Sequence, residues 1–176
     1  MKRIAAALLC SWCGCATAQT AQELIDNGKN SENVTTFGMG YNLEQFSPLK
    51  EINTSNIKRL VPVWATSLAN EAGELGQPTI YNGVMYVVNG NWTYALDVAT
   101  GEMIWRTPVE YDRGAGRISS SGIIYRGGAT IYNGKLFRES IDAHVIALDM
   151  KTGKEIWKSK FADFKEGYTE IGRAHV

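Results

Sequence analysis

The sequence has 176 residues, of which 44% are hydrophobic and 20% are charged, a balance typical of a soluble globular protein. Lysine and arginine together number 18, as do aspartate and glutamate, so the formal net charge is zero. This balance excludes a global electrostatic field that would draw the chain to nucleic acid or to an anionic membrane. We therefore expect no nucleic-acid partner.

Residues 1–18 have the three parts of a secretory signal peptide. Lys2 and Arg3 precede an apolar run over residues 4–15, and small residues follow up to Ala18. The run is shorter than the roughly 20 residues that a membrane-spanning helix needs, so we predict no transmembrane segment. Cleavage after Ala18 would leave a periplasmic protein in a Gram-negative source.

All three cysteines lie inside this signal, at positions 10, 13 and 15. The mature chain is therefore predicted to contain no disulfide and no thiol ligand. Lipid attachment at Cys10 is the alternative to ordinary cleavage.

Residues 19–64 are interpreted as an N-terminal leader. Asn53 is predicted to cap one or two helical turns over residues 54–60, and residues 61–64 are predicted to be extended. Residues 65–169 follow as an incomplete domain with an internal repeat.

The repeat has the pattern A-L-D-x-x-T-G-x-x-I-W, which spans residues 95–105 and recurs 52 positions later over residues 147–157. Upstream of each copy, I-Y-N-G occupies residues 80–83 and 131–134. A period near 50 built from short strands is typical of a β-propeller, in which each repeat forms one blade. The fold class is therefore predicted as all-β, with about two blades here.

Each repeat also predicts its own turns. Asn-Gly pairs at 82–83 and 133–134 favour two-residue hairpins, because both residues accept positive φ. In D-x-x-T-G, the Asp and Thr side chains can bond local backbone groups while the glycine returns the chain. Trp105 and Trp157 are predicted to pack between adjacent blades through their flat rings, with the indole nitrogen bonded to backbone.

Residues 170–176 are interpreted as a non-native tail. The repeat stops after Thr169, and residues 171–176 match the translation of a common sequencing adapter. We therefore exclude His175 as a ligand. His144 is predicted to be a strand or turn residue rather than a metal ligand.

The leader pattern S-P-L-x-x-I-N-x-x-N-I-x-x-L-x-P-x-W over residues 47–64, together with the two tryptophan repeats, resembles the methanol and ethanol dehydrogenase family of quinoproteins. The resemblance runs from Phe37 to Thr169. It implies an eight-bladed propeller that holds pyrroloquinoline quinone (PQQ) and Ca²⁺ or a lanthanide. The complete protein would oxidise a primary alcohol to an aldehyde and pass electrons to a cytochrome c, and this chain would be its N-terminal part.

A non-catalytic propeller scaffold is the alternative. The tryptophan repeat also occurs in the propeller lipoprotein of the outer-membrane assembly machinery, which binds other proteins. A catalytic aspartate and calcium ligands in later blades would establish the enzyme.

The resemblance implies four cofactor-binding candidates. Arg126, within Y-R-G-G-A where the family has N-R-G-x-A, would hold a quinone carboxylate through its planar fork. Ser120 and Ser121 stand where the family has two adjacent cysteines that cover the quinone. Glu74 lies one residue out of register with a family glutamate, so a bulge would be needed to aim it. Solvated loop side chains are the alternative for Arg126 and Glu74. No catalytic residue or metal ligand is expected within this chain.

Overall fold

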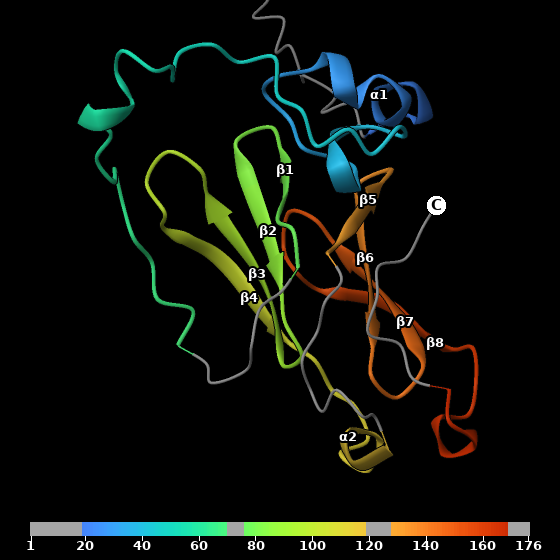
Figure 1. Cartoon of the computed structure of the whole chain (residues 1–176). Coiled ribbons are helices and arrows are strands. Elements are labelled where there is room, and N and C mark those ends of the chain that lie inside the picture. Colours follow the sequence, from blue (N-terminus) through green and yellow to red (C-terminus); the bar gives the residue numbers. More distant parts are fainter. Residues whose placement is uncertain (1–18, 70–75, 119–127, 169–176) are drawn as a thin grey trace, which may run out of the picture.

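The computed structural model describes residues 19–69, 76–118 and 128–168, and two antiparallel four-stranded sheets lie side by side within them (Figure 1). The strand orders are β1-β2-β3-β4 and β5-β6-β7-β8, each a simple meander. The first sheet contains β1 (Thr79–Tyr81), β2 (Val84–Val88), β3 (Trp92–Asp97) and β4 (Met103–Pro108). The second contains β5 (Thr130–Tyr132), β6 (Lys135–Ser140), β7 (His144–Asp149) and β8 (Glu155–Lys160). The two sheets are the predicted blades, and the all-β propeller class is confirmed.

The predicted turns close the strand pairs at one end of each blade. Asn82 and Gly83 have φ values of 49° and 77°, and Asn133 and Gly134 have 47° and 73°. Positive φ at both central residues defines a type I′ hairpin, whose twist matches that of the flanking strands. The Oδ1 of Asp97 accepts hydrogen bonds from the backbone N–H groups of Ala99 and Thr100, both at 2.9 Å. Asp149 makes the equivalent turn in the second blade.

The two tryptophans of the repeat occupy equivalent places, as predicted. Ala95 pairs with Trp105 and Ala147 with Trp157, and each pairing is followed by an irregularity in the ladder. Such bulges bend the outer strand and re-aim its side chains. The identical register confirms that both blades are copies of one unit.

Trp105 packs between the two blades. Its Nε1 donates to the carbonyl of Met150 at 3.0 Å. Its ring packs against Gly153 so closely that a Cβ added to this glycine would lie 2.5 Å from the indole. Around it, an apolar core contains Tyr86, Val88 and Ala95 of the first blade and Ile131, Leu136, Ile146 and Leu148 of the second. Burying each large aliphatic or aromatic side chain is worth about 1.5–3 kcal/mol, so the faces between blades hold the fold together.

The leader makes the same kind of contact with the first blade that Trp105 makes with the second. Trp64 Nε1 donates to the carbonyl of Val98 at 2.8 Å, and Thr66 Oγ1 donates to the carbonyl of Gly101. Thr107 makes the matching bond to Gly153 in the second blade. Residues 64–66 therefore contact the first blade as the outer strand of a preceding blade would.

Short helices make up the rest of the leader and the connections. Helix α1 (Ala21–Ile25) begins with a capping box between Thr20 and Glu23, and 3-10 helices follow at Asn27–Lys29, Phe37–Met39 and Ile57–Arg59. In chain order, helix α2 (Ala115–Ile118) comes after β4 and before β5, and a 3-10 helix at Phe164–Glu166 follows β8. Within the described ranges, no helix is long and apolar enough to cross a membrane.

The helix predicted after Asn53 is shorter than expected. The helical turn is confined to Ile57–Arg59, with Asn56 at its N-cap position. Asn53 Oδ1 accepts from the backbone N–H of Ser55 at 3.0 Å, and the Asn53 carbonyl accepts from Ile57 N at 2.9 Å. Asn53 therefore caps the turn that leads into this short helix.

Candidate functional site

The two blades have distinct ends. The end with the Asn-Gly hairpins, here the hairpin face, also carries α1 (Figure 1). The opposite end, here the loop face, carries residues 89–91 of the first blade, residues 141–143 of the second, and α2. Strand β4 ends on the loop face and β5 begins there, so the connection between the blades, residues 109–129, starts and finishes on this face.

The four candidate cofactor residues lie outside the described residues, and their positions stay predictions. Ser120, Ser121 and Arg126 belong to the connection, and Glu74 belongs to the segment before β1. The described ends of both segments meet, because Thr79 Oγ1 donates to the carbonyl of Ala129 at 2.6 Å. The structure thus brings together the starts of β1 and β5, the two strands that these segments enter.

The chemistry of the connection suits an anionic, planar cofactor. Its residues 113–129 contain three arginines, three serines and five glycines and no aspartate or glutamate, whereas Glu110 and Asp112 precede them. Guanidinium groups bind carboxylates through paired, charge-assisted hydrogen bonds, and glycines let the backbone approach a flat ligand closely. This donor-rich composition fits the carboxylates of PQQ.

The loop of the first blade fixes the start of the connection. Asn89 Oδ1 accepts from the backbone N–H groups of Asn91 and Trp92, which shapes the loop. The carbonyl of Asn91 accepts from Val109 N at 2.8 Å, and its Oδ1 accepts from the Tyr111 hydroxyl at 2.9 Å. Two anchors therefore hold the chain as it leaves β4.

Arg138, on β6, joins the two blades beneath this loop. Its side chain is buried, and the guanidinium donates to the carbonyls of Asn89 at 2.8 Å and Trp92 at 2.9 Å and to Thr93 Oγ1 at 3.1 Å. A buried guanidinium is tolerated only where its donors are satisfied, and backbone carbonyls of the neighbouring blade do this here. Sequence reasoning missed Arg138, because an arginine within a strand pattern gives no signal of burial.

Asp142 is the second residue that sequence reasoning missed. It is 3% exposed in the loop of the second blade, and its Oδ2 accepts from Asp112 N at 3.0 Å. Its Oδ1 accepts from the Ser140 hydroxyl and lies 3.2 Å from His144 Nδ1. Burial would raise the pKa of Asp142, but these hydrogen bonds and the charges of Lys158 and His144 outweigh it and lower the pKa below its ordinary value. Asp142 is thus an ionised acceptor that ties the connection to the second blade.

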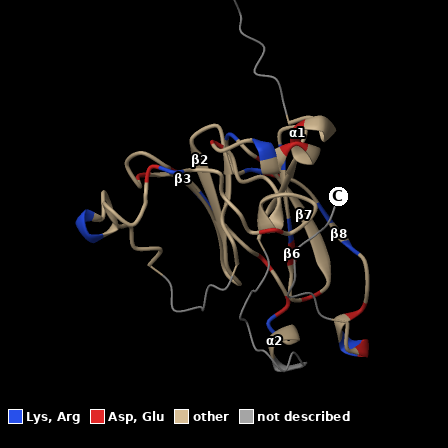
Figure 2. Cartoon of the chain, turned by 45° about the horizontal axis from the view of Figure 1, so that its top comes forward, with Lys and Arg blue, Asp and Glu red and all other residues tan. Residues whose placement is uncertain are grey.

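His144 begins β7, which confirms that it is a strand residue. Among the residues that the structure describes, no group of three or more His, Cys, Asp or Glu side chains could hold a metal ion. Basic and acidic positions are interspersed along the described chain rather than gathered in one region (Figure 2).

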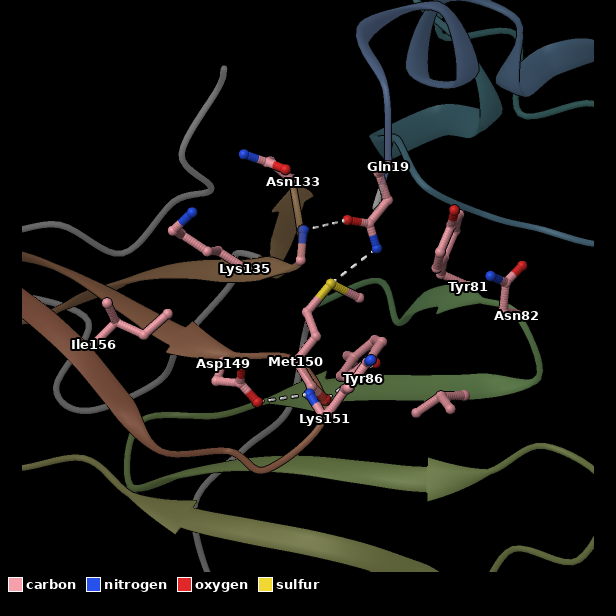
Figure 3. Close-up of a pocket in the computed structure, with 12 residues that line it drawn as sticks. Gln19, Tyr81, Asn82, Tyr86, Asn133, Lys135, Asp149, Met150, Lys151 and Ile156 are labelled. Atoms are coloured by element: carbon pink, nitrogen blue, oxygen red, sulfur yellow. Dashed lines mark hydrogen bonds between the residues drawn. The ribbon is translucent and has the colours of Figure 1, made fainter. Parts of the chain in front are cut away.

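A cavity of about 420 Å³ lies on the hairpin face, away from the connection (Figure 3). Gln19 reaches into it, accepting from Gly134 N and donating to Met150 Sδ, both at 2.9 Å. Burial, with a smaller contribution from the charge of Asp149, raises the pKa of Tyr86 to about 12, so its hydroxyl stays protonated. These contacts join the leader to the second blade and are not part of the candidate site.

Comparison with known proteins identifies the fold and the family. Residues 35–166 match the family described as glucose/ethanol/alcohol dehydrogenase, beta-propeller domain (PQQ). A curated relative, 1-butanol dehydrogenase (quinone) of Thauera butanivorans, is 36% identical over 164 residues, which are 91% of this chain and 26% of that relative.

Two solved structures are similar over most of the chain. One is a quinohemoprotein alcohol dehydrogenase from Pseudomonas putida HK5, with a TM-score of 0.83, 29% identity and coverage of 90% of this chain and 23% of that one. The other is a europium-containing methanol dehydrogenase, with a TM-score of 0.77, 31% identity and coverage of 86% and 27%. This chain thus spans about a quarter of the length of these proteins. It belongs to the family of PQQ-dependent alcohol dehydrogenases, within their β-propeller domain.

Proposed function

We propose that this chain supplies the first blades and part of the quinone site of an exported PQQ-dependent alcohol dehydrogenase. The complete protein would oxidise a primary alcohol to an aldehyde and pass the electrons to a cytochrome c. The observation that carries the proposal is the donor-rich connection, which starts and finishes on the loop face between two blades of this family's propeller.

Each candidate residue has a stated role in this proposal. Arg126 binds a quinone carboxylate, and the hydroxyls of Ser120 and Ser121 cover the ring where the family has a disulfide. Glu74 approaches the same cofactor from the segment before β1. When bound, PQQ would supply the acceptor for the alcohol's hydride, and its metal ion would supply a Lewis acid for the quinone carbonyl.

The metal ion and the general base belong to later blades in this proposal. Ca²⁺ and a lanthanide are both compatible with it, and one similar structure is named for europium. Residues 1–18 would direct the protein to the periplasm, where a cytochrome c can accept electrons.

The test is alcohol oxidation by the full-length protein that contains this segment. The apoprotein would be incubated with PQQ and Ca²⁺, or PQQ and a lanthanide, and dye reduction followed with ethanol, 1-butanol and glucose. We expect quinone-dependent oxidation of the alcohols, with aldehyde as product, and no turnover when PQQ is omitted. A folded protein that oxidises no alcohol with either metal would contradict the proposal and favour the scaffold alternative.

A further inference from the structure

The two Asn-Gly hairpins form a matched pair within one chain. Both have the sequence I-Y-N-G, at residues 80–83 and 131–134, and both have positive φ at the asparagine and at the glycine, with similar values. Each asparagine is exposed, and each glycine carbonyl accepts from the next turn of its blade, from Val98 N at 2.9 Å in the first and from Met150 N at 3.1 Å in the second. A difference in their reactivity must therefore come from their surroundings.

The leader holds the glycine of the second hairpin. Gly134 N donates to Gln19 Oε1 at 2.9 Å, and Gln19 is 4% exposed, with its Nε2 donating to Met150 Sδ (Figure 3). At the first hairpin the leader bonds the asparagine instead, whose backbone N–H donates to Asn33 Oδ1 at 2.9 Å. Within the described part of the chain, Gly83 N donates no hydrogen bond. The backbone nitrogen of Gly83 is therefore less restrained than that of Gly134.

The backbone nitrogen that follows an asparagine is a nucleophile toward the side chain of that asparagine. The nitrogen loses its proton and bonds to Cγ, the side-chain amide nitrogen leaves as ammonia, and a five-membered imide remains. One water molecule then opens the imide to aspartate or isoaspartate. A following glycine favours the attack, because it has no Cβ and lets the backbone rotate freely. The folded turn must open before the nitrogen meets Cγ, so hydrogen bonds that keep the turn closed slow the reaction.

We propose that Asn82 is a site of spontaneous deamidation and that Gln19 protects Asn133 from the same reaction. Opening the second hairpin breaks the bond from Gly134 N to a buried side chain, and opening the first breaks no equivalent bond. This inference is independent of the proposed function.

The modification has a structural consequence for the leader. Isoaspartate lengthens the backbone by one methylene group, which a two-residue type I′ turn cannot absorb without moving. The backbone N–H at position 82 is the donor to Asn33 Oδ1, so this movement loosens the leader from the first blade.

The test follows both asparagines in one sample. The full-length protein would be aged at mildly alkaline pH and digested at intervals, and mass spectrometry of the peptides would measure deamidation at each asparagine and separate isoaspartate from aspartate. We expect Asn82 to deamidate about fivefold faster than Asn133 or more, the effect of one hydrogen bond on the opening of the turn. The same protein unfolded in urea is the control, and there the two I-Y-N-G sequences should react at similar rates.

Variants of Gln19 form the second arm of the test. Gln19→Ala removes the acceptor for Gly134 N and should raise the rate at Asn133 about fivefold while the rate at Asn82 changes little. Gln19→Glu keeps a side-chain oxygen for this bond and should retain most of the protection. Asn33→Ala is the matched control, because it removes a leader contact with the first hairpin and should leave Asn133 at the wild-type rate.

Equal rates at the two asparagines of the folded protein, or a faster rate at Asn133, would overturn the inference. So would an unchanged rate at Asn133 in Gln19→Ala, or no deamidation at Asn82 in the folded protein while the unfolded control reacts. If Gln19→Ala does not fold, the comparison of the two asparagines in the wild type decides alone.

Discussion

Replacing Gly153 by alanine should break the contact between the two blades. Gly153 has φ +70°, and a Cβ built on it would lie 2.5 Å from Trp105 Cε3 and 2.7 Å from Thr107 Oγ1. The ring of Trp105 cannot move away freely, because its Nε1 donates to the carbonyl of Met150. The substitution therefore sets one methyl group against a tryptophan held in place.

The size of the effect follows from two separable costs. An alanine in the left-handed region costs about 1–2 kcal/mol, partly offset by about 0.4–1 kcal/mol from the less flexible unfolded chain. Overpacking adds about 1–3 kcal/mol. Gly134 isolates the first cost, because its φ is +73° and an added Cβ would meet nothing within 4 Å. We expect Gly153→Ala to destabilise the protein by about 1–3 kcal/mol more than Gly134→Ala.

The assay is urea unfolding of the full-length protein, followed by tryptophan fluorescence. A double-mutant cycle with Trp105→Ala completes it, since removing the ring should remove most of the extra cost of Gly153→Ala and leave only the contact with Thr107 Oγ1. If Gly153→Ala and Gly134→Ala were equally destabilising, or if the extra cost of Gly153→Ala over Gly134→Ala were undiminished without the ring, Trp105 would not be the wedge between these blades.

Three further predictions concern stability. Trp105→Phe removes the indole bond to Met150 and should cost about 1 kcal/mol or more, measured as a lower urea midpoint; an unchanged midpoint would count against that bond. The pKa of Asp142 is lowered, so its ionised form stabilises the fold above the ordinary carboxyl pKa of about 4, and this contribution is lost as the pH falls through the lower folded value. The deficit of Asp142→Ala relative to wild type should therefore be constant from neutral pH to about 5 and shrink below about 4, whereas a deficit unchanged at pH 3 would contradict the assignment. Residues 19–169 expressed alone should aggregate, because blades bury their faces against neighbours, and should catalyse no alcohol oxidation. A monomer on size exclusion that unfolds cooperatively in a thermal melt would refute the first expectation, and alcohol oxidation with PQQ would refute the second.

The blade architecture could be predicted because its signals are local. Asn82-Gly83 and the D-x-x-T-G turns specify backbone conformations within four or five residues, and the 52-residue repeat shows that they recur in one unit. The equivalent positions of Trp105 and Trp157 followed from the same repeat. The helix after Asn53 was predicted too long, because a capping Asn marks where a turn begins and not how many turns follow.

The hydrogen bonds of Arg138 and Asp142 on the loop face could not be predicted, since they join parts of the chain that are far apart in sequence. Arg138 bonds residues 45 to 49 positions away, and Asp142 bonds Asp112, 30 positions away. In the sequence, Arg138 resembles an exposed strand residue and Asp142 a loop carboxylate. The burial and the hydrogen-bond partners of Arg138 and Asp142 distinguish them from exposed residues, and both become visible only when the two sheets are packed together.

The central claim is that the connection on the loop face holds the quinone, and the affinity of the Arg126→Lys variant for PQQ tests it most directly. Lysine keeps the charge but loses the planar fork that binds a carboxylate through two hydrogen bonds. The dissociation constant of PQQ would be measured for the full-length protein at fixed Ca²⁺, with Arg59→Lys, at an exposed position of the leader, as the matched control. The account predicts that Arg126→Lys weakens PQQ binding about tenfold while Arg59→Lys leaves it unchanged. Unchanged affinity in Arg126→Lys would remove this arginine from the site and contradict the account.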